Sequence, residues 1–371
     1  MPKRTKRRRV RQKRSLTKLP SLAQVCESPD QFLGRLDIAA LNLMCAGGLP
    51  HASINFRRIF DWLDEAARKA DFDTRRHWYR FIDSPATYNN SPGYFCCYHL
   101  LQALQEDFGV RYNPARVKDP KFQDPKCIDP DFTDSRDLFI HGIIDGPGGT
   151  CASMPVLYVA VGRRLGYPLK LVEARGHLYC RWDDPEGKRL GVPERFNIEG
   201  AGYGIASYPD EHYEAWPEPW TAADKAGGFY GKSLTPSQEL AAFLCTRAEC
   251  LTDNGRIAEA IQAYRWATGL VPEDRRYRAQ LHRLDGTTAA AMYALMRPYE
   301  EQRRRHWLMQ QQLEMPAVMR DWHSGHGQSC ECFQCQQARP GPTSPAGLPS
   351  TSAFPSLPSF PQPIVPRLLG E

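Results

Sequence analysis

Residues 146–200 contain, in order, a glycine-rich turn, an apolar helix and three strand-like runs. The turn Gly-Pro-Gly-Gly (146–149) precedes the segment CASMPVLYVAVGRRLG (151–166), in which apolar residues occupy nearly every side of a helix before Arg163. Such a helix is expected to be buried all round. The strand-like runs that follow are LKLVEAR (169–175), HLYCRWD (177–183) and RFNIEG (195–200). A buried helix followed by an antiparallel sheet is typical of an α+β fold.

Helices are predicted on both sides of this stretch. Apolar spacing indicates helices over 31–45 and 54–71, and a third helix has Ser91 as its N-cap, Pro92 as its first residue and Gly109 beyond its end. Further helices are expected over 236–285 and over 287–314, the latter interrupted at Pro298. The sequence therefore divides into a disordered basic tail (1–25), a helical part (26–110), the core with the turn and sheet (111–235), a second helical region (236–320), and a His/Cys cluster with a disordered proline-rich tail (321–371).

Cys151 has the sequence context of a nucleophilic thiol. It follows the glycine turn and is predicted to start the buried helix, where free N–H groups and the positive end of the helix dipole favour a thiolate. The same N–H groups are expected to stabilise the oxyanion of a tetrahedral intermediate. Pro155 is compatible with this helix because it lies within the first turn. Most of the other cysteines are expected to be small core residues.

His177 is the expected base for this thiol. Strand alternation places it on the same face as Arg181, and it places Asn197 and Glu199 together on one face of the third strand. If the strands pair around a loop centred near residue 188, His177 faces Glu199 directly and Asn197 diagonally. Either side chain would hold the imidazole through Nδ1–H, and alternation alone does not choose between them. The position of the loop centre favours Glu199.

The run GGTCASMPVLYVAVGRRLGYPLKLVEARGHLYCRW, followed by RFNIEG, resembles the bacterial transglutaminase-like superfamily. It is most similar to the branch grouped with the invasion-regulator proteins, in which a transglutaminase-like core precedes a tetratricopeptide-type tail. FGVRYNP (108–114) is also similar to that branch, and the resemblance covers roughly residues 30–275. It implies a papain-like fold, with Cys151 as nucleophile and His177 as base. The sequence departs from the family at Glu199, where Asp is usual, and at Ala152, where an aromatic residue is common.

Residues 241–274 fit one tetratricopeptide unit of about 34 residues. The turn is Asn254-Gly255-Arg256 and Pro272 closes the unit, while Ala248, Ala260, Tyr264 and Ala267 take the small and aromatic packing positions. Because a lone repeat cannot bury its own apolar face, this unit is expected to pack on the thiol core or on residues 276–314. A peptide-binding groove is the alternative interpretation.

The two ends of the sequence suggest separate binding chemistries. The first 18 residues hold ten Lys and Arg and no acid, although the whole chain has a net charge of only +6, so this tail would attract a polyanion such as RNA. Near the other end, a Cys-x-Cys-x2-Cys pattern with nearby histidines is suited to zinc. The candidate ligands are His323, His326, Cys330, Cys332 and Cys335. No other cofactor is expected.

The sequence contains no secretory signal and no apolar run of the roughly 18 residues that a membrane span needs. We therefore expect a cytoplasmic protein that does not contact a membrane. The first functional hypothesis is acyl transfer through a thioester on Cys151, with a protein or peptide substrate and with water or an amine as acceptor. The alternative is a transglutaminase-like scaffold without turnover, which binds partner proteins through its helical repeat and tails.

Overall fold

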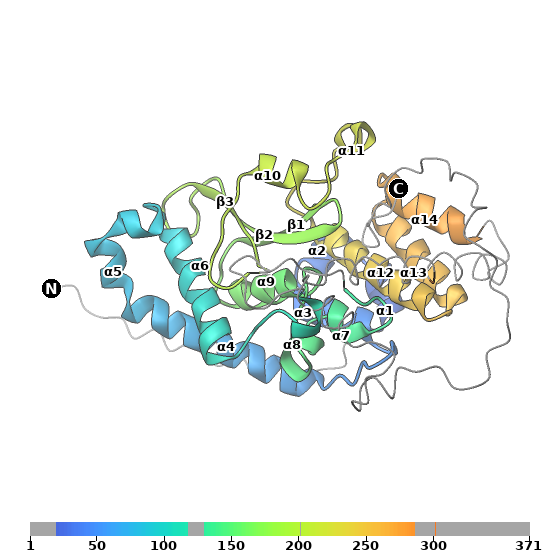
Figure 1. Cartoon of the computed structure of the whole chain (residues 1–371), viewed down its shortest axis with the longest axis horizontal. Helices are drawn as coiled ribbons and strands as arrows, with labels where there is room; N and C mark the ends of the chain where they lie inside the picture. The colour runs from blue at the N-terminus through green and yellow to red at the C-terminus, as the bar shows by residue number, and fades with distance from the viewer. Residues whose placement is uncertain (1–19, 118–129, 201, 286–300, 302–371) are drawn as a thin grey trace, which may run out of the picture. The chain divides into compact units, whose positions relative to one another are not determined.

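The three strand-like runs form one antiparallel sheet in the computed structural model of the chain (Figure 1). The structure describes residues 20–117, 130–200, 202–285 and 301. Strand β1 (Leu169–Ala174) pairs with β2 (His177–Asp184), and β2 pairs with β3 (Glu194–Ile198). Helices pack around this sheet, so the prediction of an α+β fold is confirmed.

The register between β2 and β3 differs from the expected one. Arg181 lies opposite Asn197. The paired residues are therefore arranged about a point one residue beyond residue 188, where the loop centre was expected. The cause is the loop itself, because the carboxylate of Asp184 accepts hydrogen bonds from two backbone N–H groups inside it. Residue 199 lies just beyond the end of β3, and Glu199 therefore reaches His177 diagonally instead of facing it directly.

Helix α9 (Met154–Arg164) packs against one face of the sheet and, as expected, is buried on nearly all sides. It begins three residues later than expected. The backbone N–H groups of Ser153 and Met154 donate to the carbonyl oxygen of Thr150, at 3.1 and 2.9 Å, and the Ser153 hydroxyl accepts from the N–H of Thr150 at 3.0 Å. These bonds make residues 150–153 a tight turn, so Cys151 lies in the turn that leads into the helix.

Helix α10 (Asp210–Ala215) covers the opposite face of the sheet, as Figure 1 shows. Tyr213 of this helix stacks on Tyr179 of β2 with ring centroids 3.7 Å apart. These two rings form a buried cluster with Val172 and Ala174 of β1. Helix α11 (Ala222–Gly227) follows. The sheet therefore lies between α9 and α10, and the site residues on β2 and after β3 are fixed from both sides.

Short helices and one long helix precede the sheet. They are α1 (Leu22–Cys26), α2 (Asp30–Leu33), α3 (Ile38–Ala46), α4 (Phe56–Arg76), α5 (Trp78–Asp83), η1 (Pro85–Tyr88), α6 (Pro92–Gln102), the π-helical η2 (Ala103–Asp107), η3 (Pro114–Arg116), α7 (Ser135–Leu138) and α8 (His141–Asp145). Ser91 caps α6 and Pro92 is its first residue, as predicted. The helix expected over 31–45 is instead two helices, because Asp37 caps a new helix by accepting from the N–H of Ala39.

Helix α1 lies inside the segment for which the sequence predicted disorder. Ser21 caps it in a reciprocal arrangement with Gln24, and Val25 is fully buried. The helix packs against α13 (Ile257–Leu270) of the second helical region. Residues 21–25 are therefore structured because a single apolar side chain finds a tertiary partner, which a local composition argument does not detect.

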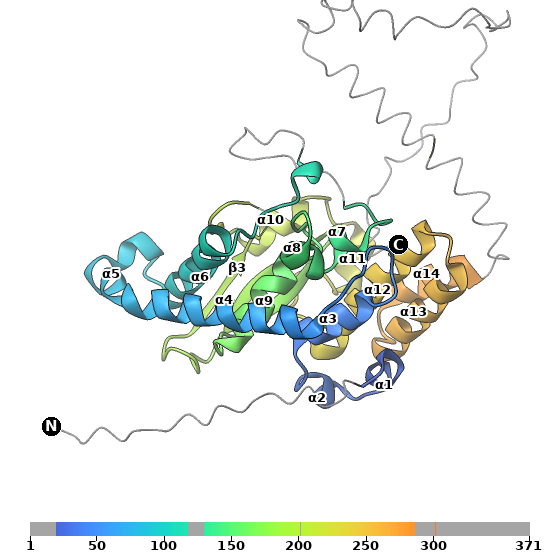
Figure 2. The same cartoon turned by 90° about the horizontal axis from the view of Figure 1, so that it is seen from below.

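The second helical region consists of α12 (Pro236–Asp253), α13 (Ile257–Leu270) and α14 (Arg275–Asp285). As expected for a tetratricopeptide-like unit, α12 and α13 form an antiparallel pair around the turn at 254–256, and the expected packing residues Ala248, Ala260, Tyr264 and Ala267 are buried. Helix α12 also packs against α2 and α3, and Figure 2 shows it beside α3. The helical pair thus packs on the part of the chain that holds the thiol.

The described residues between 20 and 285 belong to one compact unit. The helix expected over 287–314, apart from Glu301, and the proline-rich tail lie outside the described residues. Within the described part, no helix is both long and apolar enough to cross a membrane.

Candidate functional site

Cys151 is the accessible thiol of the described chain. Among the cysteines in the described ranges it is the one that is not buried, whereas the other described cysteines, such as Cys96, lie in the core. Burial raises the pKa of the Cys96 thiol to about 11 and that of Cys250 to about 12, so these thiols stay protonated and inert near neutral pH. The expected distinction between core cysteines and one site cysteine therefore holds for the described residues.

The structure brings Cys151, His177 and Glu199 together. The side chain of Cys151 interacts with that of His177 and raises the pKa of the imidazole. The ring nitrogen Nε2 of His177 lies 2.8 Å from Oε2 of Glu199. His177 and Glu199 are both buried, at 3% and 7% exposure. The imidazole thus lies between a thiol that acts on it and a carboxylate that hydrogen-bonds to it.

The carboxylate of Glu199 is held in place by two further groups. Its Oε1 accepts from the backbone N–H of Gly200 at 2.9 Å, and its Oε2 accepts from the Tyr213 hydroxyl at 3.3 Å. Tyr213 comes from α10, which covers the face of the sheet that carries His177. These bonds fix the oxygen that contacts the imidazole, which is what a positioning carboxylate in a thiol site requires.

Opposing effects act on the pKa of His177. Burial is the largest of them and lowers the pKa, since it disfavours the charged imidazolium. The negative charge of Glu199 and the side-chain interactions with Cys151 and Glu199 outweigh burial and raise the pKa from 6.5 to about 10. His177 is therefore an imidazolium at neutral pH, and its positive charge lies next to the Cys151 sulfur.

Trp216 and Tyr213 enclose the imidazole. The Trp216 ring contacts the His177 ring edge-on with centroids 4.7 Å apart, and Tyr213 lies roughly parallel to it at 6.3 Å. Trp216 itself is 40% exposed, so it separates the His177–Glu199 pair from solvent. Exclusion of water strengthens the interaction between the two charges.

Asn197, the other candidate for the third site residue, does not contact His177. Its Oδ1 accepts from Nε of Arg181 at 2.7 Å, and its Nδ2 donates to Oδ1 of Asp210 at 2.7 Å and to the carbonyl of Tyr208 at 2.9 Å. The observed register explains this. Arg181 lies directly opposite Asn197, and its guanidinium donates a hydrogen bond to the Asn197 amide oxygen. Asn197 is therefore part of a buried ion-pair network, and its assignment to the site is corrected.

The carboxylate also bonds to a different ring nitrogen than the sequence suggested. The expected bond was to Nδ1, and the observed bond is to Nε2. Glu199 lies beyond the end of β3 and approaches the ring diagonally, and it meets Nε2 from there.

Most of the N–H groups expected to form an oxyanion site are already hydrogen-bonded within the turn. Those of Ser153 and Met154 donate to the Thr150 carbonyl, and that of Ala152 donates to the Thr150 hydroxyl at 3.2 Å. The N–H of Cys151 is different, since its partner is the hydroxyl of Tyr112 at a long 3.4 Å. Of the turn N–H groups, the Cys151 N–H is the one in position to stabilise an oxyanion.

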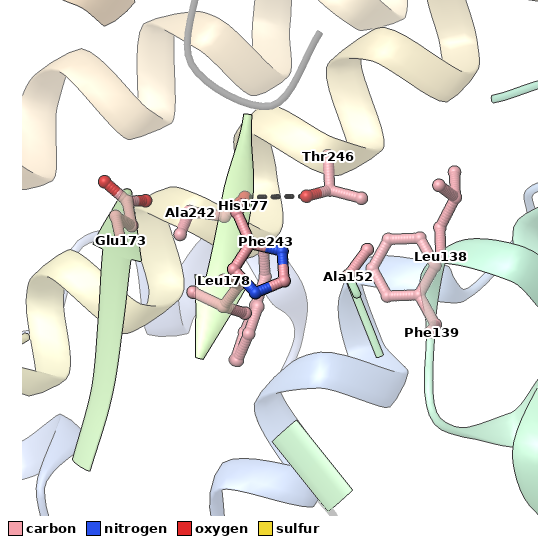
Figure 3. A pocket seen from close by; sticks show the side chains of 9 residues that line it. All are labelled: Leu138, Phe139, Ala152, Glu173, His177, Leu178, Ala242, Phe243 and Thr246. Atoms are coloured by element: carbon pink, nitrogen blue, oxygen red, sulfur yellow. Dashed lines mark hydrogen bonds between the residues drawn. The ribbon is translucent and has the colours of Figure 1, made fainter. Parts of the chain in front are cut away.

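A small cavity of about 20 Å³ lies beside His177 (Figure 3). Its walls are mainly apolar and come from Leu138, Phe139, Ala152, Leu178, Ala242 and Phe243, with Glu173 and Thr246 as further polar members. Ala242, Phe243 and Thr246 belong to α12, as Figure 3 shows. The helical region therefore supplies one wall of the cavity next to the imidazole.

The predicted zinc ligands His323, His326, Cys330, Cys332 and Cys335 lie outside the described residues, as do the first 18 residues, which hold the basic charge of the tail. Within the described ranges, no group of three or more His, Cys, Asp or Glu residues is arranged to hold a metal ion. No protein-family model, curated protein or solved structure matches this chain.

Sequence reasoning missed the aromatic residues around the thiol site. Tyr112 lies in the run FGVRYNP, yet its proximity to Cys151 depends on a contact across 39 residues of sequence. Trp216 lies in the segment YEAWPEPW, where an aromatic residue among prolines and acids is a signal of surface function. The contribution of α12 to the cavity wall has no local sequence signal.

Proposed function

We propose that this protein is a cysteine-dependent acyltransferase or hydrolase that works through a thioester on Cys151. The observation that carries the proposal is the buried Glu199–His177 pair beside the accessible Cys151 thiol. An imidazolium next to the sulfur stabilises the thiolate, which is the nucleophilic form. The resemblance to the bacterial transglutaminase-like superfamily supports the same chemistry and a papain-like arrangement of core helix and sheet.

The reaction begins with attack of the Cys151 thiolate on the carbonyl carbon of an amide or ester. A carbon–sulfur bond forms, and the π electrons of the carbonyl move to its oxygen. When this intermediate collapses, the carbon–oxygen double bond re-forms and the leaving group departs with the proton of the His177 imidazolium. The product of this half-reaction is an acyl-thioester on Cys151 and a neutral imidazole.

In the second half-reaction, His177 acts as a base. It takes a proton from water or from an amine as that molecule attacks the thioester carbon, and the thiolate is expelled. The carboxylate of Glu199 keeps the imidazole oriented in both steps and stabilises its charged form. Because a protein or peptide chain can supply both the amide and the amine, we propose a protein or peptide substrate.

The test is formation of an acyl-enzyme from p-nitrophenyl acetate. We expect one acetyl group per chain, located on Cys151 by peptide mass spectrometry, with a burst of p-nitrophenolate. Cys151→Ala and His177→Ala should lose the burst, whereas His282→Ala, which changes an exposed histidine of α14, should keep it. Acetylation at equal rates in the wild type and His177→Ala would contradict the proposal.

The alternative function is a scaffold that binds partner proteins without turnover. It would be favoured if neither Glu199 nor Asn197 reached His177, and Glu199 does reach it. Pull-down with the wild type and with Cys151→Ser distinguishes the two functions. Long-lived adducts with the wild type alone support the enzyme, and equal capture by both proteins supports the scaffold.

A further inference from the structure

We propose that the hydroxyl of Tyr112 and the backbone N–H of Cys151 together form the oxyanion-stabilising site of this centre. The inference rests on the proposed function, and it adds a catalytic residue for which nothing in the sequence pattern gave a role. It starts from a single contact, in which the N–H of Cys151 points at the Tyr112 hydroxyl oxygen at 3.4 Å.

The backbone holds Tyr112 at this position. The N–H of Gly149 donates to the carbonyl of Arg111 at 3.0 Å, and the N–H of Asn113 donates to the carbonyl of Gly149 at 2.7 Å. This pair of bonds is a parallel bridge between Tyr112 and Gly149, two residues before the nucleophile. The segment 111–113 is therefore fixed against the glycine turn by the main chain.

Gly148 permits this close approach. It has φ +137°, and a Cβ atom at this position would lie 2.8 Å from the carbonyl oxygen of Arg111 and 2.9 Å from the nitrogen of Asn113. Any residue with a side chain would push the 111–113 segment away from the turn. The glycine therefore brings the tyrosine to the thiol, which explains why a glycine is needed at this site.

Asp137 of α7 holds both sides of this arrangement. Its Oδ1 accepts from Nδ2 of the buried Asn113 at 2.7 Å, and its carbonyl accepts from the Thr150 hydroxyl at 2.6 Å. One residue thus anchors the segment that carries Tyr112 and the turn that carries Cys151. Preorganisation of this kind is what makes hydrogen-bond donors effective in a transition state.

An oxyanion would lie beside the line that joins the Cys151 nitrogen to the Tyr112 oxygen. These two atoms are 3.4 Å apart, so one oxygen placed beside that line can be about 2.8 Å from both, the usual length for a bond to a charged acceptor. In the resting state the tyrosine oxygen accepts the Cys151 N–H. When a carbonyl oxygen becomes negative during attack, the N–H and the tyrosine O–H both turn to donate to it.

Two reagents separate this role from a structural one. Acylation of Cys151 by p-nitrophenyl acetate passes through an oxyanion, whereas alkylation by iodoacetamide displaces iodide at a saturated carbon and forms none. We expect Tyr112→Phe to slow the acylation burst by about 10- to 1,000-fold, the usual effect of removing one oxyanion donor, with alkylation within about twofold of wild type. Tyr203→Phe, which changes an exposed tyrosine bonded to Glu106, is the matched control and should change neither rate.

Three outcomes would overturn the inference or its basis. An unchanged acylation burst in Tyr112→Phe excludes the hydroxyl as an oxyanion donor. An equal loss in both reactions, or a lowered melting temperature with it, assigns Tyr112 a positioning role for Cys151 only. Failure of wild-type Cys151 to react with either reagent overturns the proposed function itself, and this result differs from the first two.

Discussion

Asn197 of β3 and Glu199, just beyond its end, were both expected on the face of His177, and their environments give them different roles. Glu199 contacts the imidazole, whereas Asn197 binds the buried guanidinium of Arg181. Strand alternation could predict that both lie on the face of His177, and the resemblance could favour an acid. It could not predict the register, because the Asp184 side chain sets the loop through two hydrogen bonds that composition does not reveal.

This difference predicts separable defects for two substitutions. Glu199→Gln keeps the shape of the side chain and removes the charge, so we expect acylation to slow by about 10- to 1,000-fold, together with a loss of the stability that the charge gives near neutral pH. Asn197→Ala removes the amide that hydrogen-bonds to the Arg181 guanidinium and to the Tyr208 carbonyl. It should cost about 1–3 kcal/mol of unfolding free energy and leave acylation within a few-fold of wild type. Acylation bursts and urea denaturation measure both, and the reverse pattern would mean that the third residue is assigned wrongly.

The raised pKa of His177 also predicts how stability depends on pH. The folded-state pKa of about 10 lies above the unfolded value near 6.5, so the group stabilises the fold fully below about pH 6.5 and loses that contribution as the pH rises toward 10. In Glu199→Gln this contribution should shrink, because the charge that raises the pKa is gone. We therefore expect wild type to lose on the order of one to a few kcal/mol more than Glu199→Gln between pH 6.5 and 10 in urea titrations. Parallel curves would contradict the assigned charge state of His177.

At the scale of elements, the sequence placed the buried helix, the three strands and the helical pair α12–α13 close to their observed positions. Periodicity and caps identify such elements because they act over a few residues. The start of α9 was predicted too early, since the Ser153 side chain bonds back to Thr150 and makes residues 150–153 a turn. The contact between Tyr112 and this turn joins distant segments, and local pattern therefore carries no signal for it.

Gly148 and Gly191 give a matched pair for testing this turn. Both have positive φ, but an added Cβ meets backbone at 2.8 Å at Gly148 and finds open space at Gly191. Gly191→Ala should cost about 1 kcal/mol from backbone strain and leave Cys151 alkylation and acylation unchanged. Gly148→Ala should cost more and slow acylation, because it displaces the 111–113 segment. Equal effects of the two substitutions on acylation would contradict the close-approach role of Gly148.

At the scale of the whole described unit, a buried ion pair joins the helical region to the sheet. Arg276 of α14 donates to Glu173 of β1 at 3.0 Å and lies over the Tyr230 ring at 4.5 Å. Glu173 also lines the cavity beside His177. Burial raises the pKa of Glu173 to about 6, although the nearby Arg276 charge acts to lower it. The ionised form of this carboxylate therefore depends on Arg276. The helical region and the site are therefore expected to unfold together.

Arg276→Met tests this coupling. Loss of the cation leaves a buried carboxylate without a partner, and we expect a loss of about 3–5 kcal/mol in unfolding free energy. The double variant with Glu173→Gln should recover part of that loss. The control is Arg265→Met, which breaks the half-exposed pair with Asp285 and should cost less than about 1 kcal/mol. Equal effects of Arg276→Met and Arg265→Met in urea denaturation would show that the buried pair does not couple the two parts.

The central claim is that His177 activates Cys151 as a nucleophile. Its most direct test is the rate of Cys151 alkylation by iodoacetamide at pH 6, followed by peptide mass spectrometry in wild type and in His177→Ala. An ordinary thiol is almost entirely protonated at that pH, and the buried cysteines are inert. We expect wild-type Cys151 to react at least about tenfold faster than Cys151 in His177→Ala. Equal rates in the two proteins would contradict it.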